Sequence, residues 1–210
     1  YAVAREFRKV NPEHELVMIC ADDGVNYAKP TLSNALVANK APEQIALGDA
    51  VKMSAQLNIR IETQSWVKAI DAAAHTLTIE HDGKTHQQDY SKLVLALGAE
   101  PIRLAIAGDA SDDIHIVNHI EHYKKFRDNL SKRQDKRVVI LGAGLIGCEF
   151  ANDLQNTGHQ VTVIDLAPQP LGRLLPAHVA EAFKEKLEAT GIQFVLGTTV
   201  EKINAINEGD

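Results

Sequence analysis

The chain has 210 residues, of which 45% are apolar and 24% charged, the balance of a globular protein with a buried core. Its net charge of −6 argues against nucleic acid or an anionic membrane surface as a partner. No apolar run approaches the roughly 18 to 20 residues that a membrane span requires. The two cysteines, Cys20 and Cys148, stand far apart and outside any C-x-x-C pair. We therefore expect a cytoplasmic protein without a sulfur-rich metal site.

Two helices and a strand are predicted in the first 58 residues. Residues 1–10 have amphipathic spacing, and Pro12 cannot continue their helix because it lacks a backbone N–H. Residues 15–21 form an apolar run of strand length, of the kind buried on both faces of a parallel sheet. Residues 48–58 predict the second helix. Since the chain starts within a helix and stops on a turn, we expect a fragment of a longer protein.

The next part of the chain predicts a small antiparallel meander. Apolar and polar residues alternate over 59–71 and again over 75–90. Asp82 and Gly83 predict a tight hairpin turn, because both central residues of such a turn need positive φ. Residues 91–101 return to an apolar composition and predict a further strand, ended by a glycine and a proline.

The second half of the chain alternates helices with strands, the pattern of parallel βαβ units. The helix over 118–133 has Asn118 and Glu121 at capping-box spacing. The expected elements beyond it are strands over 136–144 and 159–167, helices over 145–158 and 176–191, and two short strands within 192–203.

A glycine-rich turn joins the strand and helix near residue 142. Gly142, Gly144 and Gly147 have G-x-G-x-x-G spacing after four apolar residues. In such a turn the first glycine permits the sharp bend, the second lets a pyrophosphate approach the backbone, and the third lets the helix pack on the strand. The phosphates then meet free N–H groups at the helix end. The motif alone is weak evidence, but its position between a strand and a helix predicts a dinucleotide site.

Asp165 follows the glycine turn by about 20 residues, where a carboxylate accepts hydrogen bonds from the adenine-side ribose. A 2′-phosphate there would be repelled, and the first basic residue beyond is Arg173. We therefore expect NADH rather than NADPH. The alternative is a glycine turn followed by an aspartate that is merely solvated.

The two halves of the chain share a pattern. Helix, strand and acidic turn over 1–23 resemble the helix, strand and aspartate over 145–165. The first half thus has the character of a second dinucleotide-binding unit without its first strand and glycine turn. The predicted fold is α/β, with Rossmann-like parallel sheets and an inserted antiparallel meander.

Three further features have two interpretations. Glu149 lies on the first turns of the helix after the glycines, where a solvent-facing carboxylate is common. His119 and His122 could share a metal, but no third ligand is evident, so surface histidines are favoured. Residues 131–137 are basic and could attract an acidic electron carrier, although a solvated connector is the favoured interpretation.

Three motifs together resemble the pyridine-nucleotide-disulfide-reductase-like flavoproteins, along essentially the whole chain. They are "YAKPTLSNAL" over 27–36, "KLVLALGAEPIR" over 92–103 and "VVILGAGLIGCEFANDL" over 138–154. The resemblance implies two dinucleotide-binding domains. Residues 1–103 would be part of an FAD-binding domain, and residues 104–210 part of an NADH-binding domain.

The resemblance places five residues along FAD. Cys20 and Ala21, after the second strand of that domain, would lie along the adenosine. Val67 in the meander would meet the adenine through its backbone. Ala96 and Gly98 would lie on the flavin–pyrophosphate side.

The resemblance also concerns the reacting centre. Lys29 would approach the flavin ring, and Glu149 would face the junction of flavin and nicotinamide, paired with Lys29. Relatives that relay electrons through thiols need cysteines beside the flavin. The corresponding segment here offers Ser33 and Asn34 instead. Thiolate relay chemistry is therefore not expected.

Within this family the match is to the branch that passes electrons to rubredoxin, a small iron protein that serves alkane hydroxylation in bacteria. The implied reaction runs from NADH through FAD to rubredoxin. One alternative is a [2Fe–2S] ferredoxin as the acceptor. Another is a flavoprotein that senses nucleotides without efficient turnover.

Overall fold

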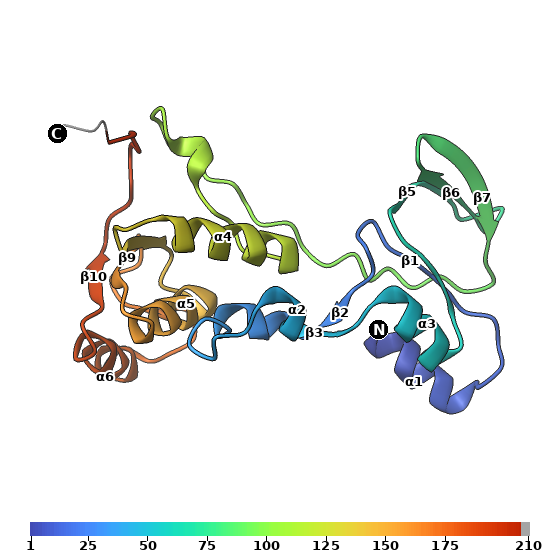
Figure 1. Ribbon diagram of the computed structural model, residues 1–210, viewed down its shortest axis with the longest axis horizontal. Helices are drawn as coiled ribbons and strands as arrows, with labels where there is room; N and C mark the ends of the chain where they lie inside the picture. Colours follow the sequence, from blue (N-terminus) through green and yellow to red (C-terminus); the bar gives the residue numbers. More distant parts are fainter. Residues whose placement is uncertain (207–210) are drawn as a thin grey trace. The chain divides into compact units, whose positions relative to one another are not determined.

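The computed structural model describes residues 1–206, which form two compact units (Figure 1). The first unit comprises Tyr1–Ala28 and Ala46–Ala99. The second comprises Lys29–Ile45 and the chain from Glu100 onward. The chain thus crosses between units close to the predicted domain boundary at residue 103. The segment 29–45, however, groups by its contacts with the second unit.

The first unit begins with a helix–strand pair that matches the prediction. Strand β1 pairs in parallel with β4, and the helices α1 and α3 lie side by side in Figure 1. Ala4 on α1 and Met53 on α3 are buried in their shared core. Asp49 caps α3, because its carboxylate accepts from the Lys52 N–H at 2.8 Å. The bounds are α1 Ala2–Val10, β1 Val17–Ile19, α3 Ala50–Leu57 and β4 Arg60–Glu62.

The predicted meander forms from residue 65 onward, in the order β5-β6-β7. Its predicted start at residue 59 is wrong, because β4 pairs in parallel with β1 instead. Asp82 and Gly83 have φ of 50° and 72°, the positive values that the hairpin requires. Two short strands that the pattern did not indicate, β2 and β3, pair antiparallel in the same unit. The bounds are β2 Asn26–Tyr27, β3 Ala46–Gly48, β5 Ser65–Asp71, β6 Thr76–His81 and β7 Lys84–Asp89.

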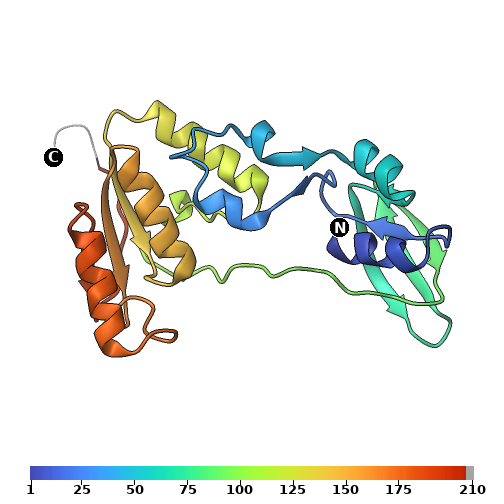
Figure 2. The same cartoon turned by 90° about the horizontal axis from the view of Figure 1, so that it is seen from below.

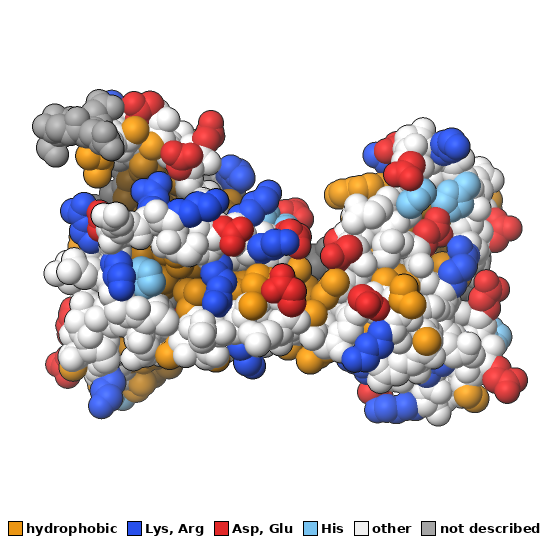
Figure 3. Space-filling model, viewed as in Figure 1, with side chains coloured by type: hydrophobic (Ala, Val, Ile, Leu, Met, Phe, Trp, Pro, Cys, Tyr) orange, Lys and Arg blue, Asp and Glu red, His pale blue; other side chains and the backbone are white. Residues whose placement is uncertain are grey.

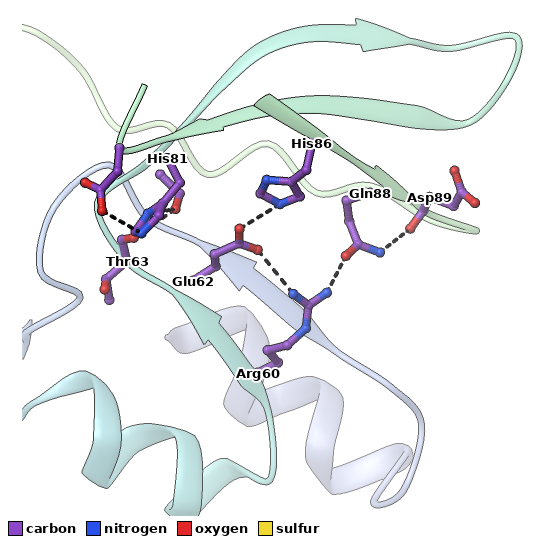
Figure 4. Close-up of polar contacts among 9 residues, drawn as sticks. Arg60, Glu62, Thr63, His81, His86, Gln88 and Asp89 are labelled. Carbon is purple, nitrogen blue, oxygen red and sulfur yellow. Dashed lines mark hydrogen bonds and ion pairs between the residues drawn. The ribbon is translucent and has the colours of Figure 1, made fainter. Parts of the chain in front are cut away.

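A polar network joins β4 to the meander (Figure 4). Glu62 Oε1 lies 2.8 Å from His86 Nε2, and its other oxygen lies 3.2 Å from Arg60 Nη1. Arg60 also donates to the side chain of Gln88, whose amide donates to the Asp89 carbonyl. The network fixes the edge of the meander against the parallel strand pair.

The strand predicted over 91–101 is not formed, so that prediction is wrong. Within the described residues this segment pairs with no strand, and Leu97 is 85% exposed. Apolar side chains of strand composition do not form a strand unless a neighbour satisfies the backbone N–H and C=O groups. The segment is apolar as expected, but its composition does not specify a strand with which it would pair.

The second unit contains a three-stranded parallel sheet in the order β10-β9-β8. Helix α5 connects β8 to β9, and α6 connects β9 to β10, so each crossover between neighbouring strands is helical (Figure 2). This is the predicted βαβ arrangement. The bounds are β8 Arg137–Leu141, α5 Leu145–Asn156, β9 Gln160–Asp165, α6 Ala177–Glu188 and β10 Gln193–Leu196.

The core of the second unit is built on α5. Ala151 and Leu154 of α5 are buried against Val161 and Val163 of β9. Phe150 packs edge-to-face on Phe126 of α4, with ring centroids 5.9 Å apart. Helix α5 is therefore held both by the sheet and by α4, which makes it a rigid support for residues at its start. Helix α4 spans Ile120–Lys132.

Two details of the second unit differ from the prediction. Helix α4 begins at Ile120, so its N-cap is His119 and not the predicted Asn118, and the His119 side chain makes no cap bond. Of the two short strands expected over 192–203, β10 forms, and the other is a single bridge between Ala107 and Lys202. The remaining short elements are η1 Lys29–Ser33, α2 Pro42–Ile45 and η2 Ser111–Asp113.

No helix within residues 1–206 combines the length and the apolar character needed to cross a bilayer. Lys and Arg side chains gather over α4 (Figure 3), where Lys124, Lys125 and Lys132 are exposed. Glu121 and Asp128 interrupt them.

Candidate functional site

The glycine turn lies between the end of β8 and the start of α5. Gly142 has φ of 113°, a value that residues with a Cβ rarely adopt, and its N–H donates to the Ile164 carbonyl at 2.8 Å. Gly144 is the N-cap of α5 and has no side chain to cap the first turn. The first N–H groups of α5 are therefore left for a ligand.

The second and third glycines are required for different reasons. A Cβ on Gly147 would lie 1.9 Å from the Gly142 carbonyl oxygen, so only glycine lets α5 approach the turn this closely. A Cβ on Gly144 would have nothing within 4 Å. The space above Gly144 is thus open within the protein, as a pyrophosphate against the backbone would need. These residues fit a dinucleotide.

Asp165 closes the turn from the end of β9. Its Oδ2 accepts from the Ala143 N–H at 2.6 Å, and its Oδ1 accepts from the Ala167 N–H at 2.7 Å. The structure thus gives Asp165 a role that the sequence did not suggest, since it fixes the backbone of the glycine turn. Each carboxylate oxygen retains a further acceptor position, so a ribose hydroxyl can still bind.

Glu149 is exposed on the first turns of α5, but its partner is not the predicted one. The Glu149 Oε2 accepts from the Ser33 hydroxyl at 2.5 Å. No ion pair joins Lys29 to Glu149 within residues 1–206, so the predicted pairing is wrong in this structure. Lys29 is exposed at the start of η1, four residues before Ser33.

The structure adds Asp153, which sequence reasoning missed. Only 1% of it is exposed, and its two oxygens accept from the N–H groups of Leu36 and Val37, both at 2.9 Å. Burial raises the pKa of Asp153, although these two hydrogen bonds act in the opposite direction. The sequence offers little signal for Asp153, because the same helix also carries Glu149, Asn152 and Gln155.

Helix α4 holds the other end of the same segment. Arg127 donates to the Lys40 carbonyl at 2.6 Å and to the Asn39 side chain at 3.1 Å. Tyr123, which is fully buried, donates to the same carbonyl at 3.3 Å. These contacts explain why residues 29–45 belong to the second unit.

The residues predicted to lie along FAD are in the first unit. Cys20 is half-buried beyond β1, where its carbonyl accepts from the Ser65 N–H, and burial and nearby aspartates raise its pKa to about 11. Ala21, Ala96 and Gly98 are exposed, and Val67 on β5 is 39% exposed.

The structure also places the predicted histidine pair and Cys148. The rings of His119 and His122 have centroids 3.5 Å apart at the start of α4. Burial and the neighbouring His119 lower the pKa of His122, which disfavours a second proton on the pair. Cys148 is buried in α5, and burial raises its pKa to about 11, as expected for a packing residue.

Comparison with known proteins decides the family. The model of the pyridine nucleotide-disulphide oxidoreductase family matches residues 1–209. The chain belongs to this family. It is 72% identical over 209 residues to the rubredoxin-NAD(+) reductase of Acinetobacter baylyi, covering all of this chain and 53% of that protein. The chain thus spans about half the length of the curated relatives that it matches.

Solved structures of the family share the fold. The water-forming NADH oxidase of Lactobacillus brevis, solved with NADH bound, superposes with a TM-score of 0.84 at 25% identity, covering 95% of this chain and 44% of the oxidase. A ferredoxin reductase from Rhodopseudomonas palustris superposes with a TM-score of 0.85 at 25% identity. The match covers 97% of this chain and 49% of the reductase. The resemblance and the α/β fold class read from the sequence are therefore confirmed.

Proposed function

We propose that the chain belongs to an FAD-dependent NADH reductase that delivers electrons to rubredoxin. The observation that carries this proposal is the open glycine turn held by Asp165, in a chain 72% identical to a rubredoxin-NAD(+) reductase. FAD supplies the chemistry when bound, since it takes a hydride from NADH and releases electrons singly.

The chain's own residues would bind and orient NADH. The backbone around Gly142, Gly144 and Gly147 receives the pyrophosphate, and Asp165 receives the adenine-side ribose. The carboxylate charge of Asp165 disfavours a 2′-phosphate, so NADH is preferred. The resemblance to the family implies that Glu149 would face the junction of the two cofactors.

FAD lies along the first unit in this proposal. By the resemblance, Cys20, Ala21 and Val67 would hold the adenosine, and Ala96 and Gly98 the flavin–pyrophosphate side. Lys29 brings a positive charge towards the flavin ring, which stabilises the anionic reduced form. The chain's two thiols lie outside the segment that holds Ser33 and Asn34, so electrons leave directly to an outside acceptor.

Rubredoxin is the acceptor that we favour, with alkane hydroxylation as the process served. The lysines over α4 provide a basic surface for an acidic carrier (Figure 3). A ferredoxin is the second candidate, because a ferredoxin reductase shares this fold. The two free cysteines favour a cytoplasmic location.

Two measurements test the proposal in the flavin-loaded protein. In stopped flow, NADH should bleach the flavin absorbance; a flavin that NADH leaves oxidised points to a nucleotide sensor. In steady state, NADH-driven reduction of rubredoxin should exceed that of a [2Fe–2S] ferredoxin. The reverse order would assign the protein to the ferredoxin reductases.

A further inference from the structure

Helix α5 holds the segment 29–45 with two carboxylates one turn apart. Asp153 binds the backbone at Leu36 and Val37, and Glu149 binds the side chain of Ser33. Residues i and i+4 lie on the same helix face, so both carboxylates meet the segment together. Asp153 fixes where the backbone runs, and this sets the position from which Ser33 projects.

The hydroxyl of Ser33 has one hydrogen and two acceptors within reach. The Glu149 Oε2 lies at 2.5 Å and the Pro30 carbonyl oxygen at 3.0 Å. An ionised carboxylate is the stronger acceptor, and the shorter distance is the one expected for a charge-assisted bond. The Ser33 hydrogen is therefore directed to Glu149.

The two side chains of this contact differ in their exposure to solvent. Ser33 is only 4% exposed, whereas Glu149 is an exposed residue. Ser33 holds Oε2 from the protein side, and within residues 1–206 no hydrogen bond engages Oε1. An exposed glutamate otherwise samples several rotamers, and holding one oxygen from a buried group restricts the side chain while leaving Oε1 available to accept.

We propose that Ser33 is a positioning residue that orients Glu149 towards the bound nucleotide and flavin. This inference rests on the proposed function, since it gives Glu149 its role at the junction of the two cofactors. It assigns to Ser33 a part in the reaction that needs no contact with either cofactor.

A double-mutant cycle in the flavin-loaded protein tests the inference. The variants are Ser33→Ala, Glu149→Gln and both together, with Ser131→Ala on the exposed end of α4 as the matched control. Stopped flow gives the rate of flavin reduction and the Kd for NADH. The same four cycle proteins are unfolded in urea without nucleotide, which measures the coupling of the two side chains independently of activity.

Ser33→Ala should slow flavin reduction about tenfold, the size expected for loss of one hydrogen bond to a charged group, while the Kd for NADH stays the same. The double variant should be no slower than Glu149→Gln alone, and the unfolding cycle should show non-zero coupling. Ser131→Ala should behave like the wild type.

Additive effects on the rate, no coupling in unfolding, or a Ser33→Ala rate equal to that of the wild type would each overturn the inference. Loss of NADH affinity without loss of rate would also overturn it, because it would indicate a general disturbance of the nucleotide site. The proposed function fails separately, if NADH leaves the wild-type flavin oxidised, and the inference then fails with it.

Discussion

Asp165 combines an architectural role with the nucleotide recognition that we propose for it. Its two oxygens accept from the backbone at Ala143 and at Ala167, on either side of the site. Hydrogen bonds to a carboxylate are roughly twice as strong as neutral ones. The residue that we expect to select NADH thus also holds the turn that receives the phosphates.

Replacing Asp165 with alanine should weaken NADH binding by about ten- to hundredfold, the range for hydrogen bonds to a charged group. NADPH binding should fall less, because the repulsion of its 2′-phosphate is also removed. The Kd values for both nucleotides check this, with Asp128→Ala on the exposed face of α4 as the control. An unchanged ratio of the two Kd values would count against the ribose role.

Substitution of Gly147 should affect the stability of the protein, whereas substitution of Gly144 should affect NADH binding. Gly147→Ala forces a Cβ to within 1.9 Å of a backbone oxygen and should lower the free energy of unfolding by about 1–3 kcal/mol, as overpacking does. Gly144→Ala has open space and φ of −79°, so its stability should match the wild type. Its methyl group occupies the phosphate space, so its Kd for NADH should rise. Equal stability of both variants would contradict this assignment.

Lys29 can be tested through the flavin itself. We expect Lys29→Ala to lower the flavin midpoint potential, because a positive charge near the ring stabilises the anionic reduced form. Spectroelectrochemical titration measures this without any turnover, and Lys40→Ala, in the same segment, is the control. A potential that does not move removes Lys29 from the reacting centre.

At the level of elements, the segment 29–45 depends on α4 and α5 for its position. It has one short α-helix and one 3-10 turn of its own, so polar contacts from Asp153 and Arg127 determine its position. Because the segment carries both Lys29 and Ser33, the geometry of the proposed reacting centre depends on these contacts.

Asp153→Asn should destabilise the protein by about 1–3 kcal/mol at neutral pH, since it replaces one of the two accepting oxygens with an NH2 donor and leaves one N–H unpaired. Urea unfolding measures this. Asp128→Asn, exposed on α4, should have no effect. A neutral result would mean that the segment is held without Asp153.

Asp153 should also leave a signature in the pH dependence of stability. Burial raises its pKa in the folded protein above the ordinary 3.8, so the folded state binds this proton more tightly than the unfolded chain. The contribution of Asp153 to the free energy of unfolding therefore declines as the pH rises from 3.8 to the raised pKa, and it is constant at higher pH. Asp153→Asn should abolish this part of the pH dependence in unfolding titrations.

For the molecule as a whole, the exposed apolar run near residue 95 is the most consequential feature. Val94, Leu95 and Leu97 are 62%, 61% and 85% exposed, and no strand of the described part covers them. Contiguous apolar surface of this kind marks a contact or an aggregation site.

The 210-residue chain on its own should therefore bind a hydrophobic dye such as ANS. Substituting Leu95→Lys and Leu97→Lys together should reduce the dye fluorescence, whereas Leu174→Lys, 60% exposed in another place, should not. Fluorescence titration with light scattering checks both statements. Equal fluorescence from all variants would show that this run is covered in solution.

The features read correctly from the sequence are those that neighbouring residues decide. The Asp82-Gly83 hairpin follows from backbone sterics, the helix–strand alternation from apolar periodicity, and the glycine turn from spacing within six residues. The family, too, was readable from local motifs, and the match over residues 1–209 confirms it.

Only the tertiary structure decided which distant groups meet. It paired Glu149 with Ser33 rather than Lys29 and bound the segment 29–45 to α5 through Asp153. In the part of the chain that the structure describes, it formed no strand over residues 91–101. Each outcome depends on a contact between residues far apart in the chain. A hydrogen bond or a strand pair of that kind needs both partners in place, and local composition specifies only one of them.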